Sequence, residues 1–190
     1  MTKKNYLYWM WKNYFTPKHI KDFNKAIIKN IRQREPMKLV ASGRDGLRKK
    51  QLQTSQILLK DISIWTDSII KDAHYINEKE FGFNLNQNFQ THDSGNYNIY
   101  SSKTKDHYKW HIDCATSNTE EIKFTVLVNL SEKKYQGGEL KLFQQDEVII
   151  KEFVPGSIVM FKSHLNHCVT PVTTGERRTF TIFITGPLWR

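Results

Sequence analysis

Two stretches of this chain decide its fold: Trp110-His111-Ile112-Asp113 and His167-Cys168-Val169-Thr170-Pro171-Val172-Thr173-Thr174-Gly175-Glu176-Arg177. Both lie among short apolar segments, as is typical of strands. On a strand, residues two apart point to the same face, so His111 and Asp113 are expected side by side. His167 must then come from another strand that the fold brings close. Arg177 lies ten residues further on, on what the pattern predicts to be the next strand.

These residue types favour a metal site. Two imidazoles and one carboxylate are the ligands of the facial triad that holds non-haem Fe(II). A His-x-Asp pair alone is weak support, because a core histidine often makes one ordinary hydrogen bond. The second stretch strengthens the interpretation, since it adds His167 and an arginine suited to gripping a carboxylate with two hydrogen bonds.

Several motifs, which follow one another along the chain in the same order as in the family, resemble those of the 2-oxoglutarate- and Fe(II)-dependent oxygenases, specifically the prolyl 4-hydroxylase-like group. They are His111-x-Asp113, Tyr135-Gln136-Gly137-Gly138-Glu139-Leu140, Pro155-Gly156-Ser157 and His167-x-Val169-x-Pro171-Val172-x-x-Gly175-x-Arg177. The resemblance covers roughly residues 97–187. It implies a double-stranded β-helix and an enzyme that oxidatively decarboxylates 2-oxoglutarate while hydroxylating an unactivated C–H bond. Fe(II), 2-oxoglutarate and O2 are the implied cofactors and co-substrates, and ascorbate is retained as an additional reductant.

The resemblance also implies roles for individual residues. His111, Asp113 and His167 would bind the metal, and Arg177 would bind the far carboxylate of 2-oxoglutarate. Thr179 and Thr181 share strand parity with Arg177, so either hydroxyl could assist, and the family register favours Thr181.

Other residues near the site keep two interpretations. Tyr100 and Tyr108 precede the first stretch. In the family that this chain resembles, tyrosines at such positions line the co-substrate pocket, although ordinary aromatic packing explains both residues equally well. Thr125 and Asn129 interrupt an apolar segment and would face either the cavity or solvent. Trp110 is expected to pack outward.

The pattern along the chain predicts an α+β fold that is mainly β. It predicts strands over 6–11, 55–59, 89–100, 108–113, 123–130, 139–143, 148–153, 158–161, 168–172 and 177–185. It predicts helices over 17–33, with Thr16 as N-cap and Pro17 first, and over 61–81, capped by Asp61. Residues 35–54 show no period and are expected to form a mobile basic loop. The resemblance sharpens this to a distorted jelly roll with N-terminal supporting helices.

Composition bounds the remaining questions. At 190 residues the chain is expected to form a single domain, 1–190, with a helical support and basic loop over 1–85 and the catalytic core over 86–190. No apolar run approaches the ~20 residues of a membrane span, so we expect a cytoplasmic protein without membrane association. Cys114 and Cys168 are interpreted as small buried apolar residues and not as a redox pair.

Charge is concentrated at one end of the chain. Residues 1–60 contain 15 Lys and Arg against 3 Asp and Glu, whereas residues 61–190 contain 14 against 16. This basic third would attract an acidic peptide, a nucleic acid or a ribosome, or it would simply be a solvated surface. Within the loop over 36–54, Arg44, Arg48, Lys49 and Lys50 would favour an acidic substrate.

The substrate has several candidates. The resemblance favours a prolyl residue of a protein or peptide. A small molecule or free amino acid, and a nucleic acid, are the alternatives. The nucleic-acid demethylases of this family carry a second arginine six residues after the co-substrate arginine, and here that position is Phe183, which argues against them. A non-catalytic binding module is disfavoured by the complete set of His111, Asp113, His167 and Arg177.

Overall fold

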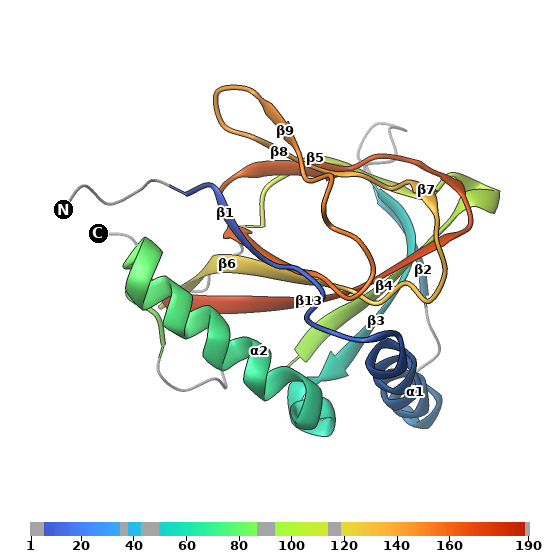
Figure 1. Cartoon of the computed structure of the whole chain (residues 1–190), viewed down its shortest axis with the longest axis horizontal. Helices are drawn as coiled ribbons and strands as arrows, with labels where there is room; N and C mark the ends of the chain where they lie inside the picture. The colour runs from blue at the N-terminus through green and yellow to red at the C-terminus, as the bar shows by residue number, and fades with distance from the viewer. Residues whose placement is uncertain (1–5, 35–37, 43–49, 87–93, 114–118, 189–190) are drawn as a thin grey trace.

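The protein folds into two facing layers of antiparallel strands with two helices packed outside one of them (Figure 1). The computed structural model describes residues 6–34, 38–42, 50–86, 94–113 and 119–188. The main sheet runs in the order β1-β10-β6-β13-β4-β3-β5-β11-β8-β9, with β2 paired to β3. The expected fold class, a mainly β jelly roll with supporting helices, is confirmed. The division of the chain near residue 85 stays a prediction.

The strands have the following bounds: β1 (Tyr8–Trp11), β2 (Lys38–Ser42), β3 (Lys50–Leu58), β4 (Ser94–Ser101), β5 (His107–His111), β6 (Glu120–Asn129), β7 (Gln136–Gly137), β8 (Leu140–Phe143), β9 (Glu147–Ile149), β10 (Ile158–Lys162), β11 (Asn166–Val169), β12 (Val172–Thr174) and β13 (Glu176–Pro187).

Helix α1 (Pro17–Arg34) begins where the sequence predicts. The Thr16 hydroxyl accepts a hydrogen bond from the His19 backbone N–H at 3.3 Å, as an N-cap does. The second predicted helix is divided into a 3-10 turn (Leu59–Ile62), α2 (Ser63–Ile76) and a π-helical turn (Asn77–Phe81). The prediction that Asp61 caps this helix is wrong. Helix α2 begins at Ser63, the residue before it is Ile62, and no side chain caps the helix.

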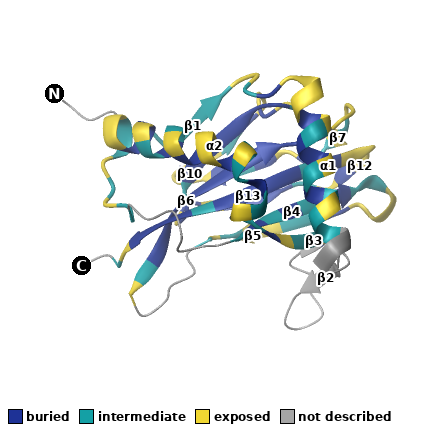
Figure 2. Ribbon diagram, turned by 90° about the horizontal axis from the view of Figure 1, so that it is seen from below, coloured by how far each residue is buried: buried dark blue, intermediate teal, exposed yellow. Residues whose placement is uncertain are grey.

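Both helices cover the outer face of the layer built from β3, β4, β13, β6 and β10 (Figure 2). The largest hydrophobic cluster fills this space and joins the two helices to the sheet through buried residues such as Phe23, Ile69, Phe124 and Phe180. Strand β6 is buried along almost its whole length. Its other face points into the space between the two layers, which is where the polar residues described below are found.

The prediction of a mobile loop over residues 35–54 is wrong for the parts of this range that the structure describes. Strand β2 pairs with β3 from Lys38↔Thr54 to Ser42↔Lys50, and β3 begins at Lys50, five residues before the predicted strand. Residues 43–49 lie outside the described part of the chain. The predicted strand over 168–172 is also divided, because β11 ends at Val169 and the chain then turns to pair β12 with β7.

Candidate active site

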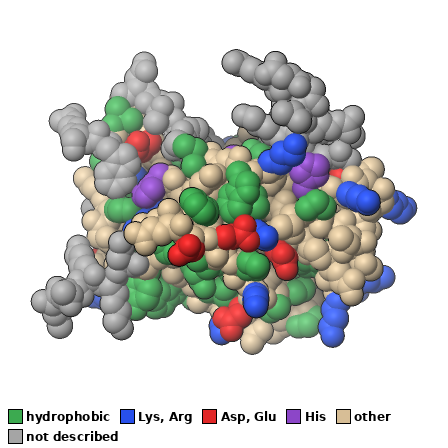
Figure 3. All heavy atoms as spheres, turned by 90° about the horizontal axis from the view of Figure 1, so that it is seen from above, with side chains coloured by type: hydrophobic (Ala, Val, Ile, Leu, Met, Phe, Trp, Pro, Cys, Tyr) green, Lys and Arg blue, Asp and Glu red, His purple; other side chains and the backbone are tan. Residues whose placement is uncertain are grey.

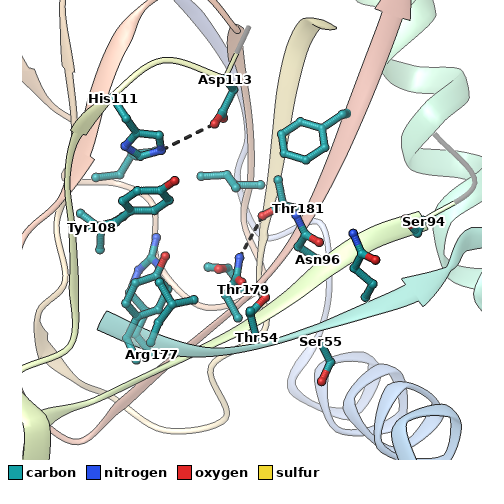
Figure 4. Close-up of a pocket in the computed structure, with 18 of the residues that line it drawn as sticks. Thr54, Ser55, Ser94, Asn96, Tyr108, His111, Asp113, Arg177, Thr179 and Thr181 are labelled. Atoms are coloured by element: carbon teal, nitrogen blue, oxygen red, sulfur yellow. Dashed lines mark hydrogen bonds and ion pairs between the residues drawn. The ribbon is translucent and has the colours of Figure 1, made fainter. Parts of the chain in front are cut away.

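The fold brings the three predicted metal ligands together. His111 on β5 is the cross-strand partner of His167 on β11, and Asp113 lies two residues beyond the end of β5. The backbone N–H of Asp113 donates to the Ser163 carbonyl at 3.0 Å, which holds the residue in place beyond the end of the strand. The potential ligand atoms of the three side chains all lie within 4.8 Å of one another. Figure 4 shows His111 and Asp113 on one side of the cavity.

Both imidazoles are oriented by backbone carbonyl groups. His111 Nδ1 lies 2.7 Å from the Lys109 oxygen, and His167 Nδ1 lies 2.9 Å from the Leu165 oxygen. A carbonyl oxygen can only accept, so each Nδ1 carries a proton. In the neutral ring the lone pair is therefore on Nε2, and these atoms face the Asp113 carboxylate at 3.6 Å and 3.2 Å. Two lone pairs directed at a carboxylate form a donor set that fits a cation such as Fe(II).

Neighbouring side chains hold the ligands in position. The Thr125 hydroxyl donates to Asp113 Oδ2 at 2.8 Å, so this buried threonine points toward the metal ligands and not toward solvent. Tyr108 stacks on the His111 ring with centroids 3.5 Å apart, and Phe161 packs edge-on against His167. Burial alone would raise the pKa of Asp113. When the imidazoles are protonated, a hydrogen bond and the charge of His167, the charge of His111 and the hydrogen bond from Thr125 together lower this pKa below its ordinary value. The carboxylate is therefore ionised and able to ligate.

Arg177 is a buried charge that pairs with no carboxylate in the described part of the chain. Its side chain is 1% exposed, and its Nε and Nη2 atoms have no hydrogen-bond partner among the described residues. Its guanidinium carbon lies 5.0 Å from the centre of the Tyr100 ring and 5.6 Å from that of Phe153. A buried guanidinium with unused donors is unfavourable unless an anion pairs with it. The side chain therefore fits the far carboxylate of 2-oxoglutarate.

The conformation of Gly138 explains the double-glycine motif. Its φ is +63°, and a Cβ atom there would lie 2.8 Å from Arg177 Cδ and 3.0 Å from Val172 Cγ2. A larger residue would press on the arginine side chain. The glycine thus leaves the space that the Arg177 side chain occupies.

One cavity of about 660 Å3 connects these groups, a size typical of sites for small molecules. Every residue predicted for the site lines it: His111, Asp113, His167, Arg177, Thr181, Tyr100 and Tyr108. Thr179 lines it too, and the Thr181 hydroxyl accepts from Asn98 Nδ2 at 3.2 Å. Burial raises the pKa of Tyr100 to about 12, although the Arg177 charge opposes this, so the phenol stays protonated and can donate.

The other residues considered from the sequence lie elsewhere. Asn129 is buried and bonds to the Tyr135 hydroxyl and the Phe153 carbonyl, and it does not line the cavity. Trp110 points outward and is 40% exposed, as expected. Cys168 is buried, and burial raises the pKa of its thiol to about 11, so it is unreactive at neutral pH. Cys114 lies outside the described residues.

The sequence did not predict the polar residues that β3 and β4 contribute to the cavity. These are Thr54, Ser55, Gln56, Ser94, Asn96 and Asn98. Half of them lie on β3: Thr54 falls in the predicted loop, and Ser55 and Gln56 fall in the predicted strand over 55–59. Only the pairing of β3 with β4 places them opposite the triad.

Replacing Thr125 with valine should weaken metal binding without unfolding the protein. Valine keeps the shape of threonine but cannot donate to Asp113. Loss of a hydrogen bond that orients a metal ligand typically lowers metal affinity about 10- to 100-fold. Iron retained after dialysis against a chelator series measures this effect. Thr66→Val, at a buried position of α2 that does not line the cavity, is the control and should bind iron as the unmodified protein does.

Comparison with known proteins agrees with this geometry. A family profile described as the 2OG-Fe(II) oxygenase superfamily matches residues 95–185, which include all seven predicted site residues. A PKHD-type hydroxylase from Synechococcus sp. (strain CC9605) is 36% identical over 83 residues, which are 42% of this chain. That match spans only 36% of the relative's own length.

Solved structures share the fold over nearly the whole chain. A Pseudomonas putida prolyl-4-hydroxylase aligns with a TM-score of 0.68 and 18% identity, covering 96% of this chain and 94% of that one. A prolyl hydroxylase from Trichoplax adhaerens, in complex with a hypoxia-inducible-factor peptide fragment, aligns with a TM-score of 0.68 and 16% identity over 95% and 84% of the two chains. With its triad and jelly roll, this chain is similar to the 2OG-Fe(II) oxygenase superfamily over residues 95–185 and shares the fold of the prolyl hydroxylases.

Proposed function

We propose that this protein is an Fe(II)- and 2-oxoglutarate-dependent dioxygenase that hydroxylates a prolyl residue of a protein or peptide. The observation that supports this most directly is that one cavity holds a three-ligand triad and a buried arginine that pairs with no carboxylate among the residues described. His111, Asp113 and His167 would hold the metal, and Arg177 the far carboxylate of 2-oxoglutarate. When bound, the metal and co-substrate supply the oxidising chemistry that this family uses on unactivated C–H bonds.

The protein's own residues order the reaction. Two backbone carbonyls and Thr125 fix the directions of the ligands, so no reorganisation is needed when a metal enters. Arg177, with Tyr100 beside it, sets how deep the co-substrate sits. Leu127, Leu140 and Val169 line the same cavity and exclude water around the reacting groups.

A peptide partner is supported by the structural similarity to the Trichoplax prolyl hydroxylase, whose structure contains a bound peptide fragment. A nucleic-acid partner has less support. Phe183 lines the cavity where the demethylases carry an arginine. On the face drawn in Figure 3, the described Lys and Arg side chains are scattered among acidic and apolar ones and form no single patch.

Among the described residues, no helix is long and apolar enough to cross a membrane.

An anaerobic titration of the purified protein with Fe(II) and 2-oxoglutarate tests the proposal. We expect a visible charge-transfer band that appears only when both are added. Admitting O2 with a candidate protein substrate should then add one oxygen atom to a proline, detected by mass spectrometry. A folded protein that shows no band with both compounds in excess would disprove the proposed site. Oxygen added only to residues other than proline would disprove the prolyl assignment.

A further inference from the structure

The cavity wall opposite the metal ligands is built from uncharged polar residues on three adjacent strands, β3, β4 and β13. We call it the carboxamide wall, and its members are Thr54, Gln56, Asn96, Asn98, Thr179 and Thr181. They form two rows across the sheet: Thr54↔Asn98↔Thr179 and Gln56↔Asn96↔Thr181. Figure 4 shows Thr54, Asn96, Thr179 and Thr181 on strands that face His111 and Asp113 across the cavity.

The alternation of residues on these strands makes the wall a distinct face. Ile57, Tyr97 and Phe180 have the opposite parity and are buried in the core beneath the helices. The wall residues therefore point into the cavity. Asparagine is unfavourable in strands, and here two lie on one strand and one face. Because nothing in the packing of the helix side requires them, their polarity serves the cavity.

Hydrogen bonds divide the wall into a satisfied part and an unsatisfied part. The Thr54 hydroxyl donates to Asn98 Oδ1 at 2.8 Å, and Asn98 Nδ2 donates to the Thr181 hydroxyl at 3.2 Å. This chain fixes the orientation of the Asn98 amide. In contrast, the carboxamides of Asn96 and Gln56 make no side-chain hydrogen bond to any described residue. Each therefore offers a donor and an acceptor to whatever enters the cavity.

The charges around the cavity limit what that group can be. Apart from tyrosines, the ionisable side chains in the described lining are His111, Asp113, His167 and Arg177. All four are assigned to the metal and 2-oxoglutarate, so none remains to pair with a charge on the substrate. A buried unpaired charge is costly, and an anion would also be repelled by Asp113. A neutral hydrogen-bonding group on the substrate avoids both the cost of burying a charge and the repulsion from Asp113.

We infer that Asn96 and Gln56 select a substrate whose segment next to the target C–H bond is neutral and carries a carboxamide, as in an asparagine or glutamine side chain of a peptide. Paired carboxamides exchange a donor and an acceptor on each side, which the wall provides. The inference rests on the proposed function and specifies its substrate class. It differs from the acidic peptide expected from Arg44, Arg48, Lys49 and Lys50, whose side chains lie outside the described residues.

Three capped peptides test the inference by binding to the Fe(II)- and 2-oxoglutarate-loaded enzyme under nitrogen, measured by isothermal titration. They share a central proline and differ only in the residues on either side of it, which are Asn, Asp or Leu. These three side chains are similar in size, so the comparison isolates charge and hydrogen bonding. We expect the Asn peptide to bind about tenfold more tightly than each of the others.

Variants connect this preference to the wall. The double variant Asn96→Leu/Gln56→Leu should lose the preference, so that the Asn and Leu peptides bind within about twofold of each other. Gln53→Leu is the matched control, because Gln53 lies on the same strand with the opposite parity and is exposed. It should keep the full preference.

The outcomes separate this inference from the proposed function. Equal or tighter binding of the Asp or Leu peptide, binding of none of the three, or an unchanged preference in the double variant would each overturn the inference. In all of these cases an intact Fe(II)–2-oxoglutarate band in the unmodified protein leaves the proposed function standing. Absence of that band in the unmodified protein would overturn the proposed function itself.

Discussion

Replacing Arg177 with methionine should abolish useful binding of 2-oxoglutarate. Methionine fills much of the same volume but cannot pair with a carboxylate. Removing one partner of a buried charge pair typically costs about 2–5 kcal/mol, which corresponds to roughly a 30- to 5000-fold loss of affinity. The metal-free, co-substrate-free variant should also be more stable than the unmodified protein, because its Nε and Nη2 donors no longer lie buried without partners.

Thermal unfolding measures both effects at once. The midpoint of the unmodified protein should rise with added 2-oxoglutarate, whereas the midpoint of Arg177→Met should start higher and not respond. Arg178→Met is the control on the same strand, because Arg178 points to the other face and pairs with Glu176 at 2.6 Å. It should respond to 2-oxoglutarate normally. A full response in Arg177→Met would show that the co-substrate carboxylate binds elsewhere.

Replacing Asp113 with alanine should remove iron binding and with it all turnover. The carboxylate is the only anionic member of the triad and faces Nε2 of both histidines. Its loss removes a metal ligand outright, so we expect an affinity loss beyond the about 100-fold that follows from disturbing a ligand's orientation. Thr125→Val should accordingly have the smaller effect of the two, because it leaves Asp113 in place.

Iron content after anaerobic loading and gel filtration gives the readout for Asp113→Ala. Asp146→Ala, in the exposed turn between β8 and β9, is a matched control that should retain iron. If Asp113→Ala kept stoichiometric iron, the two histidines would have to bind the metal with a different third ligand. The assignment of the triad would then be wrong, although the similarity to the family would remain.

The polar strand β3 shows where sequence patterns fail in this fold. A strand is recognised when apolar residues alternate with polar ones on the solvent side. Residues 50–54 of β3 are Lys-Gln-Leu-Gln-Thr, with one apolar residue among five, so the first half of the strand lacks the apolar signal. The region was therefore predicted to be a loop. Cross-strand pairing with β4 and β2, which involves distant parts of the chain, determines its structure instead.

The sequence by itself predicted the candidate metal ligands, Arg177, the helices and the resemblance to the family, because each depends on residue types at a fixed spacing: His111-x-Asp113, the motif from His167 to Arg177, and the helical period after Thr16. Tertiary structure alone decided what surrounds these groups. The bond from Thr125 to Asp113 and the carboxamide wall opposite them arise from strand register. Register is set by contacts between residues far apart in the chain, and a shift of one residue would turn every wall side chain into the core.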